Sequence, residues 1–286
     1  MTGYYLYGLL RPTPSPTASK SPATTESPAM PAESQLVEGL AGGKVQLLQP
    51  AGCRIVALGE AVHIDSWSAQ LQQAQDENNL HWLASRALQH QQVIDRWLAQ
   101  GVYPLRFATL VPDEAGLSQL LQRYQDHVLQ ELTRLQGYWE WTLRVWLSEA
   151  QVQQRSLADN PALQQQAHAL QQASSGRAYL QQRKLEQDLR QQSQHSLRRL
   201  RASLADTLPP HCHAWQLRER LPEVEKGYRA VLEAVVLLSK QQEQQLRSHL
   251  ARLEPALHSQ LSGPFAPYNF FSAPDDVAAS SAASAD

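Results

Sequence analysis

The chain has 286 residues, a hydrophobic content of 42% and a formal net charge of −2 at pH 7. This composition is typical of a globular protein that is long enough for two domains. A near-neutral charge argues against a nucleic-acid-binding surface, which needs a strongly basic face. Because no apolar run approaches the roughly 20 residues that span a bilayer, we expect neither nucleic acid nor a membrane as a partner.

The two cysteines and the N-terminus suggest a compartment. Cys53 and Cys212 lie far apart in sequence, which favours buried free thiols in a reducing environment over a disulfide. The N-terminus has no basic region or cleavage site, and its apolar stretch Tyr4–Leu10 has the composition of a strand. The sequence therefore predicts a cytoplasmic protein.

The first half predicts an α+β domain over residues 1–137. Strands are expected at Tyr4–Leu10 and Val102–Leu110, and a hairpin joins Lys44–Leu48 to Arg54–Val62 across Pro50-Ala51-Gly52. Helices are expected from Asp65, from Leu80 to a stop at Gly101, and from Pro112, where apolar residues recur at three- and four-residue spacing. Residues 12–34 are rich in Pro, Ser, Thr and Ala, and we expect a disordered insert there.

The second half predicts a domain over residues 138–271, followed by a disordered tail at 272–286. A strand at Tyr138–Leu147 is followed by a short helix after Asn160-Pro161 and a long one between Gly176 and Pro209. Strands at Ala214–Leu217 and Val231–Leu238, a helix at Gln241–Leu253 and a strand at His258–Leu261 complete the order. Strand, helices, strand, strand, helix, strand is a ferredoxin-like order with an elaborated helical crossover.

The strand at Tyr138–Leu147 alternates with a period of two. Trp139 and Trp141 lie on its apolar side, and Glu140 lies on the other. We therefore expect Glu140 to be solvated or ion-paired. Trp146, on the polar side, is the best candidate for an exposed anchor.

An aromatic run closes the second domain: Leu261-Ser262-Gly263-Pro264-Phe265-Ala266-Pro267-Tyr268-Asn269-Phe270. Its prolines fix φ and lack N–H donors, so it cannot be a helix or a central strand. We expect it to leave its sheet at Ser262-Gly263 and continue as an extended tail. Phe265, Tyr268 and Phe270 then either pin the tail to the protein or contact a partner.

No complete catalytic, cofactor or metal site is visible. Gly39-Leu40-Ala41-Gly42-Gly43-Lys44 lacks the first glycine and the Ser/Thr of a phosphate loop, so a hinge-like loop is the better interpretation. His211-Cys212-His213 lacks a third or fourth ligand at a recognisable spacing, which favours a surface strand entrance over a metal site. We expect no cofactor, no metal and no enzymatic activity.

Five segments, in order along the chain, resemble motifs of the GvpL/GvpF family of gas vesicle proteins. Residues 262–270 are similar to the family's closing Ser-Gly-Pro-Trp-Pro-Pro-Tyr-Ser-Phe signature, with Phe265, Ala266 and Asn269 as departures. The others are Tyr4-Tyr5-Leu6-Tyr7-Gly8, Arg106-Phe107-Ala108-Thr109-Leu110 (with Ala108 for a Gly), Gly137-Tyr138-Trp139-Glu140-Trp141, and Gly176-Arg177-Ala178-Tyr179-Leu180.

The resemblance implies a two-domain α+β, non-catalytic accessory or minor structural protein of the gas vesicle. It would contact the hydrophobic shell protein and other gas vesicle accessory proteins. It also favours a structural or contact role for Glu140 and Trp141. The alternatives are a small-ligand-binding or enzymatic protein on a ferredoxin-like scaffold, and a coiled-coil scaffold built on residues 113–137 and 176–208. The helical stripes are too short to sustain several heptads.

Overall fold

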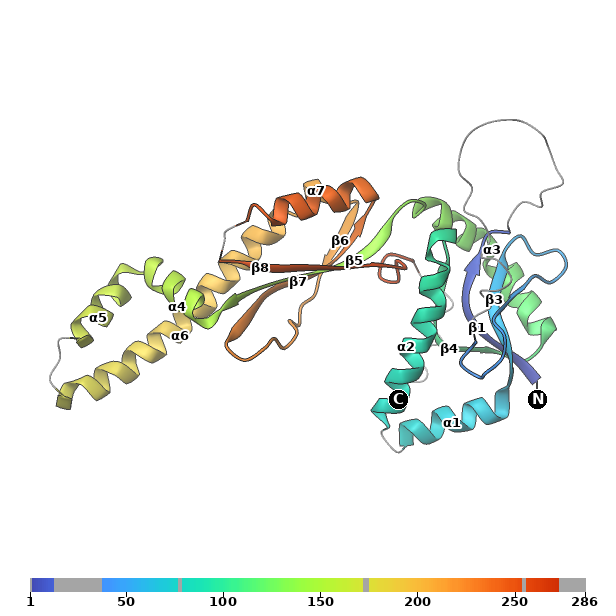
Figure 1. Cartoon of the computed structure of the whole chain (residues 1–286), viewed down its shortest axis with the longest axis horizontal. Helices are drawn as coiled ribbons and strands as arrows, with labels where there is room; N and C mark the ends of the chain where they lie inside the picture. The colour runs from blue at the N-terminus through green and yellow to red at the C-terminus, as the bar shows by residue number, and fades with distance from the viewer. Residues whose placement is uncertain (1, 13–37, 77–78, 172–174, 254–255, 273–286) are drawn as a thin grey trace. The chain divides into compact units, whose positions relative to one another are not determined.

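A computed structural model describes residues 2–12, 38–76, 79–171, 175–253 and 256–272 (Figure 1). The chain forms two compact units, one made of residues 1–136 and 265–286 and the other of residues 137–264. Each unit contains a four-stranded antiparallel sheet with helices, so the fold is α+β. Within the described ranges, no helix combines the length and the hydropathy needed to span a membrane.

The sheet of the first unit has the strand order β2-β3-β1-β4. Its strands are β1 (Thr2–Leu10), β2 (Gln46–Leu48), β3 (Val56–His63) and β4 (Tyr103–Val111). Its helices are α1 (Ile64–Asp76), α2 (Leu80–Arg96) and α3 (Glu114–Arg134), with a 3-10 turn, η2 (Leu98–Gln100), after α2. The antiparallel pairing of β2 with β3 confirms the predicted hairpin.

Both faces of this sheet are covered by helices. Tyr5, Tyr7 and Leu10 of β1 belong to a hydrophobic cluster that includes residues of α1 and α2. Leu6 and Leu9 belong to a second cluster that includes residues of α3. The register of β1 shifts after Leu6. That bulge explains why Leu10 lies on the same face as Tyr7, whereas strict alternation would place it opposite.

The sheet of the second unit has the order β6-β7-β5-β8. Its strands are β5 (Trp139–Ser148), β6 (Ala214–Leu217), β7 (Tyr228–Leu238) and β8 (His258–Phe265). Its helices are α4 (Glu149–Ala158), α5 (Pro161–Gln171), α6 (Ser175–Asp206) and α7 (Lys240–Leu250), with a 3-10 turn, η3 (Pro209–His211), after α6. One hydrophobic cluster joins β5 and β7 to α6 and α7.

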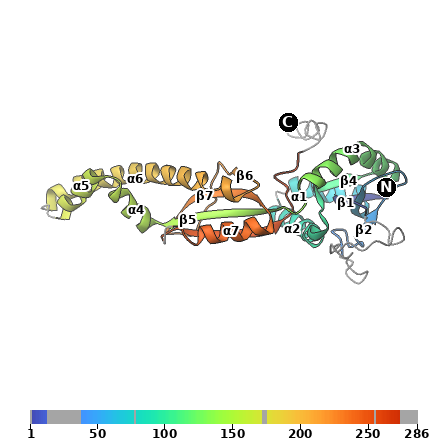
Figure 2. The ribbon, with the colours of Figure 1, turned by 90° about the horizontal axis from the view of Figure 1, so that it is seen from above.

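Helix α4 is the element that the sequence prediction missed. Ser148 caps it, because its side chain accepts from the N–H of Gln151 while the Gln151 side chain returns to the Ser148 N–H. This reciprocal pair is a capping box, and Ser148-x-x-Gln151 was the signal for it in the sequence. In Figures 1 and 2, α4 and α5 lie along α6, and the three helices extend beyond the ends of the strands of their unit.

The sequence predicted that the chain leaves the second sheet at Ser262-Gly263, and this prediction is wrong. Strand β8 continues through Pro264 to Phe265. The sheet tolerates this proline because β8 is an edge strand, and an edge strand does not need every N–H for its ladder. Whereas the sequence assigned residues up to 271 to the C-terminal domain, residues 265–272 group with the first unit. Apart from Pro12 and Ser272, the predicted insert at 12–34 and the tail at 272–286 lie outside the described residues.

Candidate functional site at the C-terminal tail

The tail, residues 265–272, packs onto both hydrophobic clusters of the first unit. Ala266 is fully buried in the cluster of Tyr5 and Tyr7, and Tyr268 packs against the same cluster. Phe271 packs against the second cluster, with its ring centroid 4.2 Å from that of Tyr103 on edge strand β4. The tail therefore contributes to the core of the first unit on both faces of its sheet.

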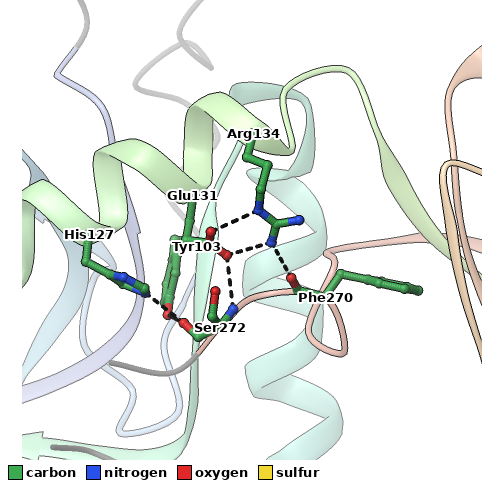
Figure 3. Close-up of polar contacts among 6 residues, drawn as sticks. All are labelled: Tyr103, His127, Glu131, Arg134, Phe270 and Ser272. Atoms are coloured by element: carbon green, nitrogen blue, oxygen red, sulfur yellow. Dashed lines mark hydrogen bonds and ion pairs between the residues drawn. The ribbon is translucent and has the colours of Figure 1, made fainter. Parts of the chain in front are cut away.

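Four side chains of β4 and α3 hold the main chain of the tail, and we call them the tail clamp: Tyr103, His127, Glu131 and Arg134 (Figure 3). Arg134 donates to the carbonyl of Phe270 over 2.5 Å, and the Ser272 N–H donates to Oε2 of Glu131 over 3.0 Å. The Ser272 carbonyl accepts from Nε2 of His127 at 2.7 Å and from the Tyr103 hydroxyl at 3.3 Å.

Every one of these contacts on the tail side is made by a backbone group. The tail clamp therefore fixes the path of the main chain and does not depend on which side chains the tail carries. The side chains of the tail matter through the apolar packing of Ala266, Tyr268 and Phe271.

Glu131 is the electrostatic centre of the tail clamp. It is only 5% exposed, and Arg134 grips its carboxylate with two hydrogen bonds, of 2.9 Å to Oε1 and 2.7 Å to Oε2. The Arg134 guanidinium, and secondly the Ser272 N–H, lower the pKa of Glu131 to about 2 against the opposing effect of burial. The carboxylate thus stays charged, with its hydrogen-bonding capacity used by the protein itself.

Two motifs from opposite ends of the second unit meet at Trp141 and Gly263. Trp141 is 7% exposed and belongs to the core, and the Arg247 guanidinium lies 5.3 Å from its ring centroid. A Cβ on Gly263 would lie 2.8 Å from the Trp141 ring and 2.9 Å from the Glu140 carbonyl. Gly263 also has φ of +147°, a region that disfavours other residues. Only glycine fits here without a shift of the neighbouring atoms.

Glu140 is buried, with 6% of its surface exposed, so the prediction of a solvated carboxylate is wrong. The alternation itself was right, because Trp141 and its cross-strand partner Val236 belong to the core cluster of this unit, whereas Glu140 and its partner Leu237 do not. The error was the assumption that this face of the sheet is exposed to solvent. Leu237, on the same face as Glu140, is fully buried. The ion-paired alternative stays a prediction.

The other aromatic candidates are neither fully exposed nor fully buried. Trp146 is half-buried and stacks on His258, with ring centroids 6.0 Å apart and planes 14° apart. Phe265 and Phe270 are half-buried as well. The sequence prediction overlooked Phe271, although its proximity to the aromatic run was a usable signal.

The glycine-rich loop at residues 39–43 encloses a buried carboxylate. Glu60 of β3 is fully buried, and its two oxygens accept from the N–H groups of Ala41 and Gly43, each at 3.2 Å. The Tyr7 hydroxyl donates to Oε1 over 2.5 Å. A Cβ on Gly39 would lie 2.3 Å from the Glu60 carboxylate, so a residue with a side chain does not fit at this position.

The loop therefore resembles an anion-binding loop whose anion is part of the protein. The Tyr7 hydroxyl also accepts from the Leu40 N–H over 2.9 Å, and burial, together with the Glu60 contact, raises the pKa of Tyr7 far above its ordinary value. Sequence reasoning interpreted the loop as a hinge and did not single out Glu60, whose position in an apolar strand was the available signal.

His211, Cys212 and His213 do not converge on one point. The His213 ring stacks on Tyr138 with centroids 4.0 Å apart, whereas the His211 ring lies 4.5 Å from that of His249. Burial raises the pKa of the Cys212 thiol to about 12, which disfavours a thiolate ligand. Across the part of the chain that the structure describes, no group of three or more His, Cys, Asp or Glu residues is arranged to hold a metal ion.

A polar groove of about 730 Å³ also lies in the first unit, between residues 38–42 and the helices α1 and α2. Arg86, in its wall, donates to the Leu40 carbonyl over 2.9 Å and to the Gln89 side chain over 3.0 Å. Arg86 thus fastens the loop to α2.

Comparisons with known proteins show that this chain is similar to gas vesicle proteins. Residues 3–272 match the family described as "Gas vesicle synthesis protein GvpL/GvpF". Gas vesicle protein L of Streptomyces sp. (strain CB03234) is 31% identical over 201 residues, which cover 67% of this chain and 71% of the relative. Gas vesicle protein L of Haloferax mediterranei is 26% identical over 202 residues, covering 66% of this chain and 61% of the relative.

Two crystal structures share the fold. GvpF from Anabaena sp. PCC7120 matches with a TM-score of 0.62 and 18% identity, over 96% of this chain and all of that one. GvpF from Microcystis aeruginosa matches with a TM-score of 0.57 and 16% identity, over 95% of this chain and 99% of that one. The sequence motifs, the two-sheet fold and these matches lead to one conclusion: the chain belongs to the GvpL/GvpF family of gas vesicle proteins.

Proposed function

We propose that this protein is a non-catalytic accessory or minor structural component of gas vesicle formation. In this role it contacts the hydrophobic shell protein and other accessory proteins. The observation that carries the proposal is the family match over residues 3–272, which spans both units and the tail. A strongly apolar shell subunit needs its surface covered in water before it is incorporated, and an adaptor protein meets that need.

The polar groups of the first unit support a structural rather than a catalytic role. A catalytic acid or base needs a proton-transfer position open to a substrate. Glu60 is instead enclosed by the loop at 39–43 and Tyr7, and Glu131 is occupied by Arg134 and the tail. These groups stabilise the protein that holds them.

We infer further that the second unit is a ferredoxin-like domain with an elaborated crossover. Its element order is β5, the helices α4 to α6, β6, β7, α7 and β8, and its strand order is β6-β7-β5-β8. These two orders support the inference, since a β-α-β-β-α-β chain with its first and third strands central makes this arrangement.

The tail serves this function by completing the first unit, in our proposal, and not as a detachable binding peptide. Ala266, Tyr268 and Phe271 contribute to the two clusters, and the tail clamp holds the backbone between and beyond them. The assembly surface then depends on a folded first unit. Phe265, Phe270 and Trp146, which are half-buried, remain candidates for direct contact with a partner.

Deleting the gene in a cell that makes gas vesicles, and then restoring it, tests the function. We expect cells without this protein to lose vesicles, and the wild-type chain to restore them and to co-purify with the shell protein. Normal vesicle yield in its absence, with no shell protein captured by the wild-type chain, would refute the proposed function.

The double variant Phe265→Ala/Tyr268→Ala tests the role of the tail. We expect the melting temperature and the vesicle yield to fall together, because removing a buried aromatic ring costs about 3–5 kcal/mol and a half-buried one somewhat less. Leu88→Ala, on an exposed side chain of α2, is the matched control and should change neither quantity. A variant that melts like the wild type yet no longer captures the shell protein would identify the tail as a binding site.

A further inference from the structure

Helix α6 is longer than its own unit can cover. It has 32 residues, and α4 and α5 lie along one side of it (Figures 1 and 2). Leu185, Ser196 and Leu200 are buried, and Ser196 donates to the Asp159 side chain beyond the end of α4 over 2.6 Å. A neighbouring stripe of the helix is left exposed over its first four positions, Tyr179, Arg183, Glu186 and Arg190.

That stripe has a regular spacing, and we call it the α6 seam. It consists of Tyr179, Arg183, Glu186, Arg190, Ser193 and Leu197, which are separated by steps of four, three, four, three and four residues. Alternating steps of three and four are the heptad spacing with which one helix packs along another. Tyr179 is 59% exposed, and the three charged residues are exposed. Ser193 and Leu197 are half-buried and form the edge of the seam against the unit itself, because the Ser193 hydroxyl lies 3.0 Å from that of Ser156 in α4 and Leu197 packs against the core cluster.

A groove of about 670 Å³ is lined by four of the six seam residues, Glu186, Arg190, Ser193 and Leu197. Its walls include Glu149 and Val152 of α4, Leu189 and Leu197 of α6, and Arg229 at the start of β7. The lining combines three apolar side chains with four charged ones, and the volume of the groove is sufficient to take side chains from another helix. At the other end of the seam, the Arg183 guanidinium lies over the Tyr179 ring, 5.4 Å from its centroid.

The order of residues along the seam decides what fits it. An antiparallel copy of α6, related by a two-fold axis level with residue 188, brings Glu186 beside Arg190 of the second copy, and Arg190 beside its Glu186. The same axis places Tyr179 over Leu197 of the second copy, at the groove, and Arg183 beside its Ser193. The stripe is thus complementary to itself in charge and in apolar character, as a two-fold interface requires.

We propose that the α6 seam is a self-association surface, on which a second copy of this chain docks with its α6 antiparallel. The two Glu186–Arg190 pairs set the register and the direction of the helices. Tyr179 of each copy fills the groove at Leu197 of the other. With six seam positions per helix, this is a short coiled coil rather than the long scaffold that the sequence argued against. The dimer is therefore weak and forms at high local concentration.

Reversing charges in the seam tests the proposal. Sedimentation equilibrium of the full chain, taken to about 100 µM (an ordinary range for weak dimers), measures the dimer dissociation constant. Glu186→Arg puts four arginines together at the centre, and Arg190→Glu puts four glutamates there. Each single variant should raise the dissociation constant at least about tenfold, and the double variant E186R/R190E, which restores both pairs, should return to within about threefold of the wild type.

Lys184 and Asp188 provide the matched control, because they have the same spacing on the same helix but lie off the seam. Lys184→Glu and Asp188→Lys repeat the charge changes and should leave the dissociation constant unchanged. Helix content by circular dichroism verifies that every variant is folded. A wild-type chain that stays monomeric throughout, single reversals that leave the dimer intact, or a double variant that fails to restore it would each overturn the proposal.

Discussion

The backbone N–H of Ala108 donates to the hydroxyl of Tyr5 over 3.0 Å, at a residue whose φ is +66°. The hydroxyl in turn lies 2.9 Å from Nδ1 of the buried His90, whose Nε2 donates to the Leu105 carbonyl over 3.1 Å. Burial lowers the pKa of His90 to about 4, so the ring is neutral and Nδ1 accepts from Tyr5. The left-handed turn in β4 is therefore held in place by side chains of β1 and α2.

Ala108→Gly should stabilise the first unit. A left-handed conformation costs a residue with a Cβ about 1–2 kcal/mol, while glycine loses up to about 1 kcal/mol more chain entropy on folding, so we expect a net gain of about 0.5–1 kcal/mol. Chemical denaturation measures the change. Ala61→Gly, at an exposed position of the regular strand β3, is the control and should lose a similar amount. A destabilised A108G variant would contradict this account of the turn.

Gly263→Ala should destabilise the second unit. The added Cβ meets the Trp141 ring and the Glu140 carbonyl at under 3 Å, in addition to the cost of φ. We expect a loss of about 3 kcal/mol or more, since neither the core ring nor the backbone can move away freely. Gly227→Ala separates the two effects, because Gly227 has φ of +91° with nothing within 4 Å of a Cβ. Equal losses in the two variants would mean that the contact with Trp141 adds nothing.

Glu60→Gln should destabilise the first unit more than any exposed Glu→Gln change. The amide group cannot accept from the Gly43 N–H and the Ala41 N–H at the same time, so one partly buried donor loses its partner. We expect a cost of about 1 kcal/mol, the low end of the range for a buried group, and the lost charge-assisted hydrogen bonds add to it. Denaturation of E60Q beside E38Q, a change on an exposed side chain at the edge of the loop, gives the comparison. Equal stability of the two variants would contradict the role assigned to Glu60.

Glu131 should make the tail sensitive to acid. Its pKa is about 2 in the folded protein against an ordinary value of 4.5, so its contribution to stability is complete above pH 4.5 and is lost as the pH falls toward 2. At neutral pH this contribution is about 3 kcal/mol. The free-energy difference between the wild type and E131Q should therefore shrink over that interval. Glu114→Gln, on the exposed first turn of α3, is the control. A difference that stays constant between pH 4.5 and 2 would refute the role of the carboxylate.

Local patterns predicted most of the elements, and they failed where a contact is distant in sequence. Strand β6 matches its predicted bounds, Ala214–Leu217, and the period of two in β5 assigned Trp141 to the core correctly. The burial of Glu140 could not be deduced, because it depends on what covers the far face of the sheet. Helix α4 could have been found, since Ser148-x-x-Gln151 is a local signal.

The tail clamp could not be predicted from the sequence. Its members contact backbone groups of residues 270 and 272, and backbone groups leave no trace in side-chain patterns. Packing of the tail on the protein was one of the two alternatives that the aromatic run left open. The destination of the tail required the structure, because residues 265–272 group with a unit that begins more than two hundred residues earlier.

Because the last segment of the first unit follows the whole second unit in sequence, the first unit cannot be completed until late in translation. Residues 137–264 must be translated before the ribosome reaches the segment that fills the two clusters of the first unit. At about 5–20 residues per second, the wait lasts roughly 6–26 s. During it, Tyr103, Glu131 and Arg134 are present without the tail that they bind. We expect the protein to depend most on chaperones during translation, while its N-terminal half still lacks the tail.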